Sequence, residues 1–191
     1  MNQIEIEQFL KNFKGLILDA DGVWFTGEEC RVVFKNGEVG VMKNRSHQDG
    51  QGLSFLRALG IEVVFATGEG EPMNSIVEKL NNLPSVRVGD WKPVSLFTQQ
   101  LQKKGKVDAI ESWLQAQDLS WEECVYIGDD RTDHEAMSLT ALKVAPSNAT
   151  RVIRKIADIV LEKEGGNGAI REFAEMVLDA RNVDETKLPA A

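Results

Sequence analysis

The chain lacks the features typical of membrane-spanning, disulfide-stabilised or secreted proteins. Among its 191 residues only two are cysteines, and no apolar run approaches the roughly 18–20 residues that a transmembrane helix needs. Residues 1–14 mix Glu, Gln and Lys with isolated apolar residues, unlike a signal peptide. Cys30 and Cys124 have no metal-ligand spacing and make no disulfide framework, which predicts a reduced, cytoplasmic setting.

Basic residues are outnumbered by acidic ones. The 22 lysines and arginines against 30 aspartates and glutamates give a formal net charge of -8. No Lys/Arg run could follow a phosphate backbone, so we expect neither a nucleic-acid nor a membrane partner. The proportions, 42% hydrophobic and 27% charged, are those of a globular domain. The length predicts one domain, residues 1–181, followed by a polar tail, residues 182–191.

Short apolar runs alternate with amphipathic stretches, which predicts an α/β fold with a mostly parallel sheet between helices. The runs that we expect to form buried strands are Gly15–Asp19, Ile61–Ala66, Cys124–Gly128, Leu142–Ala145 and Ala157–Leu161. The stretches that we expect to form helices are Ile4–Phe13, Gly52–Leu59, Met73–Leu83, Val107–Gln117 and Ala169–Ala180.

Two segments depart from this alternation. Asn36-Gly37 separates two strand-like runs, Arg31–Phe34 and Val39–Met42, and this pattern predicts a β-hairpin. The segment Ser85–Lys104 is rich in Gln and Lys and contains proline. For it we expect one strand near Val86–Val88 and an inserted loop.

Polar side chains of three chemical types follow the expected strands. Ligands of parallel sheets bind beyond the carboxyl ends of the strands, so these side chains should converge. They comprise acids, a hydroxyl and an ammonium: Asp19 and Asp21, Thr67 before Gly68, Lys106, and Asp129, Asp130 and Asp133. Crowded carboxylates repel one another unless a cation compensates them.

This set has the chemistry for phosphoryl transfer. Mg²⁺ prefers carboxylates and phosphate oxygens, and we expect Asp19, Asp129 and a backbone carbonyl near Asp21 to hold it. Asp19 is placed to attack phosphorus and form an aspartyl-phosphate. Asp21, two residues on, is the expected general acid and base.

Other members of the set have supporting tasks. Thr67, the N–H groups from Gly68 onward and Lys106 are expected to bind the equatorial phosphate oxygens. Asp130 and Asp133 are expected to orient the site, with a direct metal contact by Asp133 left open. By position, Glu69, Gly166 and Asn167 are candidate substrate contacts.

The motifs resemble those of the haloacid dehalogenase superfamily of phosphatases, in order and spacing. They are Asp19-x-Asp21-Gly22-Val23, Thr67-Gly68, Lys106 and Gly128-Asp129-Asp130-x-x-Asp133. The chain further resembles one branch, the phosphatases of 2-keto-3-deoxy sugar acid phosphates, including KDO 8-phosphate and KDN 9-phosphate phosphatases and the C-terminal domain of animal CMP-sialate synthetases. Asp49-Gly50-x-Gly52, similar to a turn after the branch's hairpin, and residues 165–173 carry this resemblance.

The resemblance implies a Rossmann-like domain with no cap and a hairpin flap, here about residues 24–44. It implies a Mg²⁺-dependent enzyme that hydrolyses the phosphate monoester of a nonulosonate 9-phosphate or KDO 8-phosphate through an aspartyl-phosphate. It also implies a homotetramer in which a neighbour's flap or tail helps to close the site. Between Asp21 and Thr67 there is no insertion long enough for a cap domain.

Three positions depart from the KDO 8-phosphate pattern, which has arginine where Gln48, Glu69 and Asn167 stand here. The KDN-type enzymes carry basic residues on the helix after Glu69, where this chain offers only Lys79. Neither specificity therefore transfers completely, and a phosphatase for a different small phosphomonoester stays open.

Two functions of other classes remain as alternatives. One is a catalytically idle oligomerisation domain, against which the complete motif set counts. The other is a receiver-type signalling domain, which also places Asp, Thr and Lys around Mg²⁺. Such domains carry the phospho-acceptor further along the chain and lack the Asp19-x-Asp21 pair after the first strand.

Overall fold

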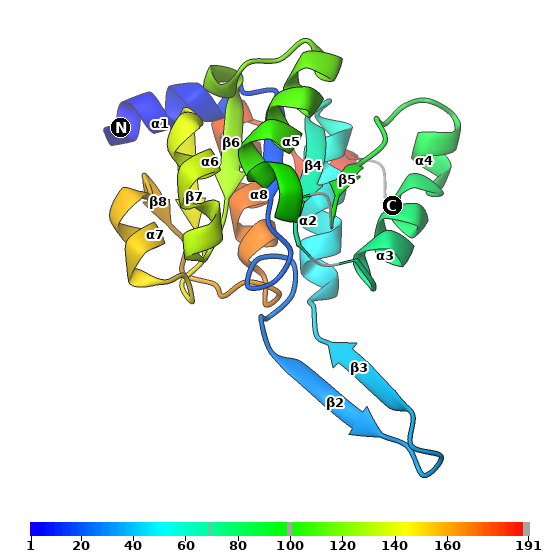
Figure 1. The fold of residues 1–191 in the computed structure, drawn as a ribbon. Helices are drawn as coiled ribbons and strands as arrows, with labels where there is room; N and C mark the ends of the chain where they lie inside the picture. The colour runs from blue at the N-terminus through cyan, green and yellow to red at the C-terminus, as the bar shows by residue number, and fades with distance from the viewer. Residues whose placement is uncertain (69, 99–100, 189–191) are drawn as a thin grey trace.

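A parallel sheet with helices on both faces forms the body of the molecule, and a two-stranded hairpin projects from it (Figure 1). The computed structural model describes residues 1–68, 70–98 and 101–188. The strands are β1 (Gly15–Leu18), β2 (Glu29–Val33), β3 (Val39–Lys43), β4 (Glu62–Ala66), β5 (Ser95–Phe97), β6 (Cys124–Ile127), β7 (Leu142–Ala145) and β8 (Ile159–Val160). The helices are α1 (Gln3–Leu10), α2 (His47–Ala58), α3 (Met73–Asn81), α4 (Pro84–Arg87), α5 (Leu101–Gln117), α6 (His134–Leu139), α7 (Arg151–Ile156) and α8 (Ala169–Arg181).

The sheet has the order β5-β4-β1-β6-β7-β8, and every neighbouring pair is parallel. In the register, Leu18 of β1 lies opposite Phe65 of β4 and Ile127 of β6, so the three strands end within one residue of one another. The chain leaves β1 and later returns on both of its sides. This is the topological switch point at which such sheets bind ligands.

Residues of β1 alternate between two apolar cores. Leu16 and Leu18 point into a cluster that includes Phe173 of α8, whereas Ile17 points into one that includes Trp113 of α5. A strand with a helical layer on each face is buried on both sides, which explains the uninterrupted apolar runs of β1, β4 and β6. The expected α/β fold is therefore confirmed.

The predictions for residues 85–104 are wrong in part. Residues 86–88 form no strand, because Pro84 begins the short helix α4, and proline favours the first helical position. The strand of this region is β5, three residues that pair with β4 at the sheet edge. Gly105, with φ 73°, interrupts α5 immediately before Lys106.

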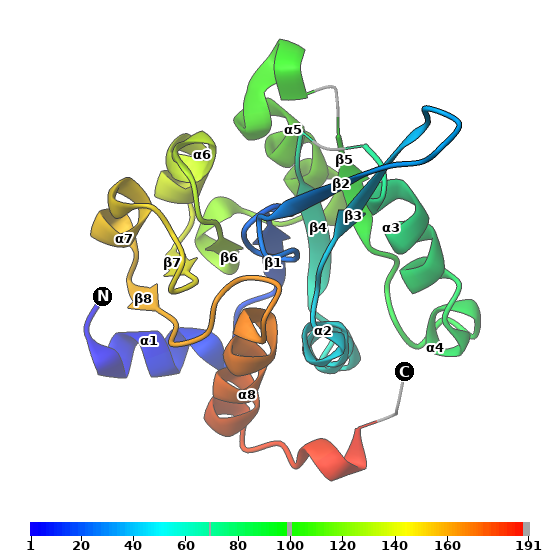
Figure 2. The same ribbon diagram turned by 90° about the horizontal axis from the view of Figure 1, so that it is seen from below.

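The hairpin prediction is confirmed, with β2 and β3 paired from Glu29↔Lys43 to Val33↔Val39. A second expectation near the hairpin is wrong, because residues 49–52 form no turn and lie within α2. Buried Asp49 accepts hydrogen bonds from the backbone N–H groups of Gly168 and Arg171 at 3.0 and 3.1 Å. Gly52 lies directly against Arg171, which lets α2 pack closely on α8. Viewed from below, α2 and α8 lie beside each other, and the chain runs from β3 directly into α2 (Figure 2).

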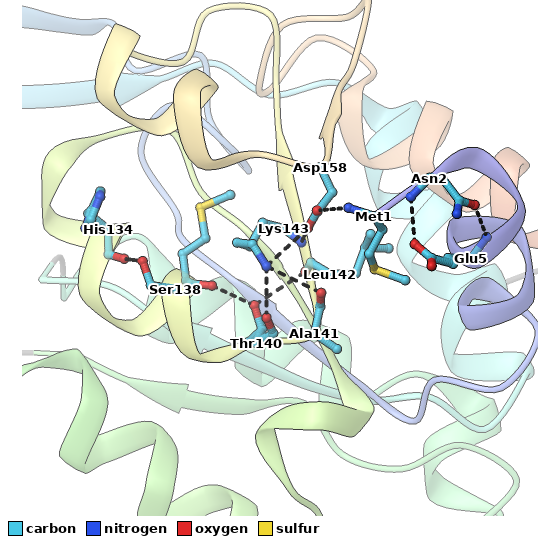
Figure 3. A network of polar contacts seen from close by, with 11 residues as sticks. Met1, Asn2, Glu5, His134, Ser138, Thr140, Ala141, Leu142, Lys143 and Asp158 are labelled. Carbon is cyan, nitrogen blue, oxygen red and sulfur yellow. Dashed lines mark hydrogen bonds and ion pairs between the residues drawn. The ribbon is translucent and has the colours of Figure 1, made fainter.

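The N-terminus is attached by polar contacts to the edge of the sheet formed by β7 and β8 (Figure 3). The Met1 ammonium and the Lys143 Nζ contact opposite oxygens of Asp158 at 2.9 and 3.2 Å. Asn2 and Glu5 cap α1 reciprocally, at 3.0 and 2.8 Å. The Lys143 ammonium also bonds the backbone oxygen of Thr140 at 3.2 Å, which links α1 to the loop between α6 and β7.

Candidate active site

A cavity of about 560 Å³ opens beyond the carboxyl ends of β1, β4 and β6. Its walls come from segments far apart in the chain, and they include most of the side chains that the sequence predicts to converge. The lining residues are Asp19, Asp21, Gly22, Gly27, Thr67, Gly68, Gly105, Lys106, Asp129, Asp130, Thr132 and Glu135. Of the lining residues, Gly27, Gly105, Thr132 and Glu135 are absent from the predicted set, and the predicted Asp133 is not among those that line the cavity.

Lys106 joins the loop after β1 to the loop after β6. Its Nζ lies 2.7 Å from Asp19 Oδ1 and 2.6 Å from Asp133 Oδ1. Burial alone would lower the pKa of Lys106, but the two carboxylates outweigh it and raise that pKa. Gly105 breaks the helix immediately before Lys106, so the residue sits at the start of a helical segment facing the cavity.

Asp19 is almost enclosed, and burial raises its pKa to about 7, an effect that Asp133 reinforces and Lys106 opposes. Burial and the Asp133 charge thus disfavour the ionised form of Asp19 more than Lys106 favours it. A further cation beside Asp19 would stabilise its carboxylate. The same side chain lies on the cavity wall, where it can meet a bound molecule.

Asp133 has no exposed surface, and its two oxygens accept four hydrogen bonds. The donors are Lys106 Nζ at 2.6 Å, Tyr126 Oη at 2.9 Å, and the backbone N–H groups of Asp129 and Asp130 at 3.0 and 3.1 Å. Burial, with the nearby Asp133 charge, raises the pKa of Tyr126 well above its ordinary value, which keeps the phenol a donor. Asp133 therefore orders the loop around it, and each of its oxygens already accepts two hydrogen bonds.

The carboxylate of Asp129 is the least satisfied acid of the site. Its Oδ1 is buried and has no hydrogen-bond partner among the described residues. Burial raises the pKa of Asp129 to about 8, with Asp19 and Asp133 adding to the effect. An orphaned buried acceptor is costly unless a donor or a metal ion completes it.

The donor set fits a magnesium ion. Oxygens of Asp19, Asp129 and Asp133 lie within 4.8 Å of one another. Hard divalent cations take oxygen ligands, and Mg²⁺ is commonly held by one or two carboxylates and substrate phosphate. Because the Asp133 oxygens already accept four hydrogen bonds, Asp19 and Asp129 are the residues that would hold the ion.

The second strand end contributes Thr67 and Gly68. Thr67 is buried, its backbone N–H donates to Phe97 O at 3.0 Å, and both residues line the cavity. A Cβ atom at Gly68 would meet no atom of the described residues within 4 Å, its two chain neighbours left aside, which leaves room for a ligand beside this backbone. The candidate contact Glu69 lies outside the described residues.

The glycine-rich loop, residues 165–168, packs against the segment after β1. Neither Gly166 nor Asn167 is among the residues that line the cavity. A side chain at Gly166 would overlap the backbone of Thr26, so this loop packs directly against the segment after β1. Asn148, absent from the sequence prediction, joins the two segments by bonding Gly22 O at 3.0 Å and the Gly165 N–H at 2.7 Å.

The fold and the acidic cavity are consistent with a hydrolase of the α/β class, and comparison with known proteins shows the family. Residues 70–173 match the family of haloacid dehalogenase-like hydrolases, and the chain belongs to that family. It is 30% identical over 178 residues to the 3-deoxy-D-manno-octulosonate 8-phosphate phosphatase KdsC of Escherichia coli, covering 93% of this chain and 86% of that one. The Haemophilus influenzae KdsC is 29% identical over 176 residues, covering 92% and 88%.

A solved structure extends the likeness to a liganded relative. The 3-deoxy-D-manno-octulosonate 8-phosphate phosphatase of Moraxella catarrhalis, in complex with magnesium, phosphate and KDO, superimposes with a TM-score of 0.75 at 26% identity. The match covers 95% of this chain and 94% of that one. The expected family resemblance is thus confirmed. None of the described helices is long and apolar enough to cross a membrane.

Proposed function

We propose that the chain is a magnesium-dependent phosphatase that hydrolyses KDO 8-phosphate through an aspartyl-phosphate on Asp19. The observation that carries this proposal is the Asp19–Lys106 pair at 2.7 Å, facing a cavity in which a buried oxygen of Asp129 has no partner among the residues that the structure describes. Similarity to KDO 8-phosphate phosphatases over more than nine-tenths of the chain supports the substrate class.

Asp19 acts as the nucleophile in this proposal. One of its oxygens bonds to phosphorus while the bond from phosphorus to the sugar oxygen breaks. Asp21 gives its proton to the departing oxygen and then takes one from the water that hydrolyses the aspartyl-phosphate. Lys106 and the Thr67–Gly68 segment neutralise and orient the phosphate oxygens. Bound Mg²⁺ supplies the positive charge that a phosphate dianion needs among so many carboxylates.

We further propose that the active form is a homotetramer in the cytoplasm. Five large apolar side chains of the hairpin are at least half exposed, from 53% to 71%: Val33, Phe34, Val39, Val41 and Met42. Val33 pairs with Val39 and side chains alternate along a strand, so Val33, Val39 and Val41 lie on one face of the hairpin. Exposed apolar side chains gathered in this way are typical of an interface. The proposal of four subunits rests on the family resemblance. The cytoplasmic setting is supported by two free cysteines, Cys30 and Cys124.

A panel of sugar phosphates tests the function. KDO 8-phosphate, KDN 9-phosphate and N-acetylneuraminate 9-phosphate are assayed at fixed Mg²⁺ and again with the metal chelated. We expect Mg²⁺-dependent phosphate release, with the highest kcat/KM for KDO 8-phosphate. A higher value for a nonulosonate 9-phosphate would move the substrate assignment to that branch. Folded protein that hydrolyses no phosphomonoester would leave the idle oligomerisation domain as the function.

A further inference from the structure

Lys43, the last residue of β3, contacts Asp21, whose side chain lines the cavity. Its Nζ lies 2.8 Å from each of the two Asp21 carboxylate oxygens. The Lys43 side chain is 5% exposed and that of Asp21 is 37% exposed. The ring centroid of buried Phe25 lies 5.6 Å from the same ammonium. The amine is thus enclosed, while the acid that it holds stays open to the cavity.

The backbone around this contact is fixed from several sides. The Thr26 N–H donates to Asn44 O at 3.1 Å, which attaches the end of the hairpin to the loop after β1. The Ser46 N–H donates to Gly166 O at 2.7 Å, which attaches the same segment to the glycine-rich loop. The separation of the Lys43 and Asp21 backbones is therefore set by hydrogen bonds independent of their side chains.

We propose that Lys43 is a positioning residue that holds the Asp21 carboxyl group in the orientation for proton transfer. This inference rests on the proposed phosphatase function. A general acid or base must lie within hydrogen-bond reach of the atom that it serves, and an aspartate on an open loop has several side-chain rotamers. A charged contact to both oxygens from an enclosed amine selects one of them. Lys43 acts through Asp21 and is not assigned a contact with the substrate.

A double-mutant cycle tests this role with Lys43→Met, Asp21→Asn and the combined variant, assayed on KDO 8-phosphate with Mg²⁺. We expect Lys43→Met to lower kcat roughly 10- to 100-fold, the cost of misplacing a catalytic group by about 1 Å. In the Asp21→Asn background, Lys43→Met should alter kcat less than about twofold. If Lys43 acts only through Asp21, the effects of the two substitutions on kcat do not add. Lys35→Met, in the exposed hairpin turn, is the matched control.

A second readout separates positioning from structural damage. Nitrophenolate departs without needing a proton, so kcat/KM for p-nitrophenyl phosphate should fall less than about threefold in Lys43→Met, since kcat/KM reports the steps up to the first irreversible one. Static light scattering and thermal unfolding check assembly and folding. If Lys43→Met changes either, Lys43→Gln replaces it in the same cycle.

Three results would overturn the inference. The first is that Lys43→Met lowers kcat equally in the wild type and in the Asp21→Asn background. The second is a raised KM at unchanged kcat, which would make Lys43 a substrate contact. The third is that Lys43→Met leaves kcat unchanged. If the wild type hydrolyses phenyl phosphate but not KDO 8-phosphate, the substrate assignment fails, and the cycle run on phenyl phosphate still decides the role of Lys43. If it hydrolyses neither, the proposed function and this inference fail together.

Discussion

Gly22 leaves the space that the Asp129 carboxylate occupies. A Cβ atom at residue 22 would overlap Asp129 Oδ2, and the residue adopts φ +78°, a conformation that favours glycine. The loop after β1 and the loop after β6 can therefore approach closely only with glycine here. The magnesium-binding geometry that we propose depends on this approach.

Gly22→Ala should displace Asp129 and weaken Mg²⁺ binding about 10- to 100-fold, the range found when the surroundings of a metal ligand are disturbed. Gly60→Ala is the matched control, because Gly60 has φ +79° and a Cβ atom there would meet nothing within 4 Å in the described part of the chain. The control should lose about 1–2 kcal/mol of unfolding free energy from backbone strain alone. Calorimetric Mg²⁺ titration of both variants distinguishes them, and equal affinities would contradict the assigned role of Asp129.

Asp19→Asn should abolish most of the activity. The change removes the nucleophile and an expected metal ligand together, so we expect kcat to fall by roughly 10³-fold or more, given several kcal/mol for the metal contribution alone. Asp90→Asn, on the surface, serves as the control with the same chemical change. Circular dichroism verifies folding. A loss smaller than tenfold in the folded variant would be incompatible with a nucleophilic Asp19.

Mg²⁺ binding should strengthen as the pH rises. In the metal-free protein the pKa of Asp19 is about 7 and that of Asp129 about 8, so both carboxyls still hold protons near pH 6. The metal must displace these protons. Affinity should therefore increase at least about tenfold between pH 6 and pH 8, and calorimetry in buffers of different ionisation enthalpy should detect released protons. An affinity independent of pH would show that other groups bind the ion.

The raised pKa values of Asp19 and Asp129 also determine whether the folded protein gains or loses stability as the pH rises. Both groups start from 3.8 and are raised in the folded chain, so the native state binds more protons than the unfolded state above about pH 4. The metal-free protein should lose stability as the pH rises from 4 through 8, and Mg²⁺ should offset the loss. Thermal unfolding with a chelator and with excess Mg²⁺ measures both effects. A chelated protein whose Tm rises over this interval would have the opposite linkage.

The hairpin supplies a test of assembly. Val41 is 53% exposed on β3, and Val41→Glu should reduce the molar mass measured by light scattering, because burying an unpaired carboxylate opposes association. Val88, 71% exposed outside the hairpin, provides the control Val88→Glu, which should keep the wild-type mass. If Val41→Glu assembles like the wild type, the interface lies elsewhere.

The central strands could be predicted because their residues are buried on both faces. β1, β4 and β6 read as continuous apolar runs, and their ends place Asp19, Thr67 and Asp129 at one edge by the geometry of parallel strands alone. Peripheral elements have no such signal. β5 is three residues long and only partly buried, so its sequence resembles a loop, and Pro84 begins a helix in a segment with too few residues for periodicity.

The missed site residues depend on contacts between distant segments. Lys43 ends a hairpin strand and meets Asp21 only after the hairpin root docks on the loop after β1. Tyr126 looks like an ordinary strand residue until its hydroxyl is found on Asp133. Asn148 follows β7 in a loop, and its amide joins Gly22 to Gly165. No spacing rule in a single sequence specifies such pairs.

The most direct measurement is the identification of the phosphorylated residue during turnover. Wild-type protein with Mg²⁺ and KDO 8-phosphate labelled in its phosphate is quenched with acid within a turnover and digested, and the labelled peptide is sequenced. We expect transient, hydroxylamine-sensitive label on the peptide that contains Asp19, and none in Asp19→Asn. Rapid turnover that leaves no label on Asp19, or places it on another side chain, would contradict the account.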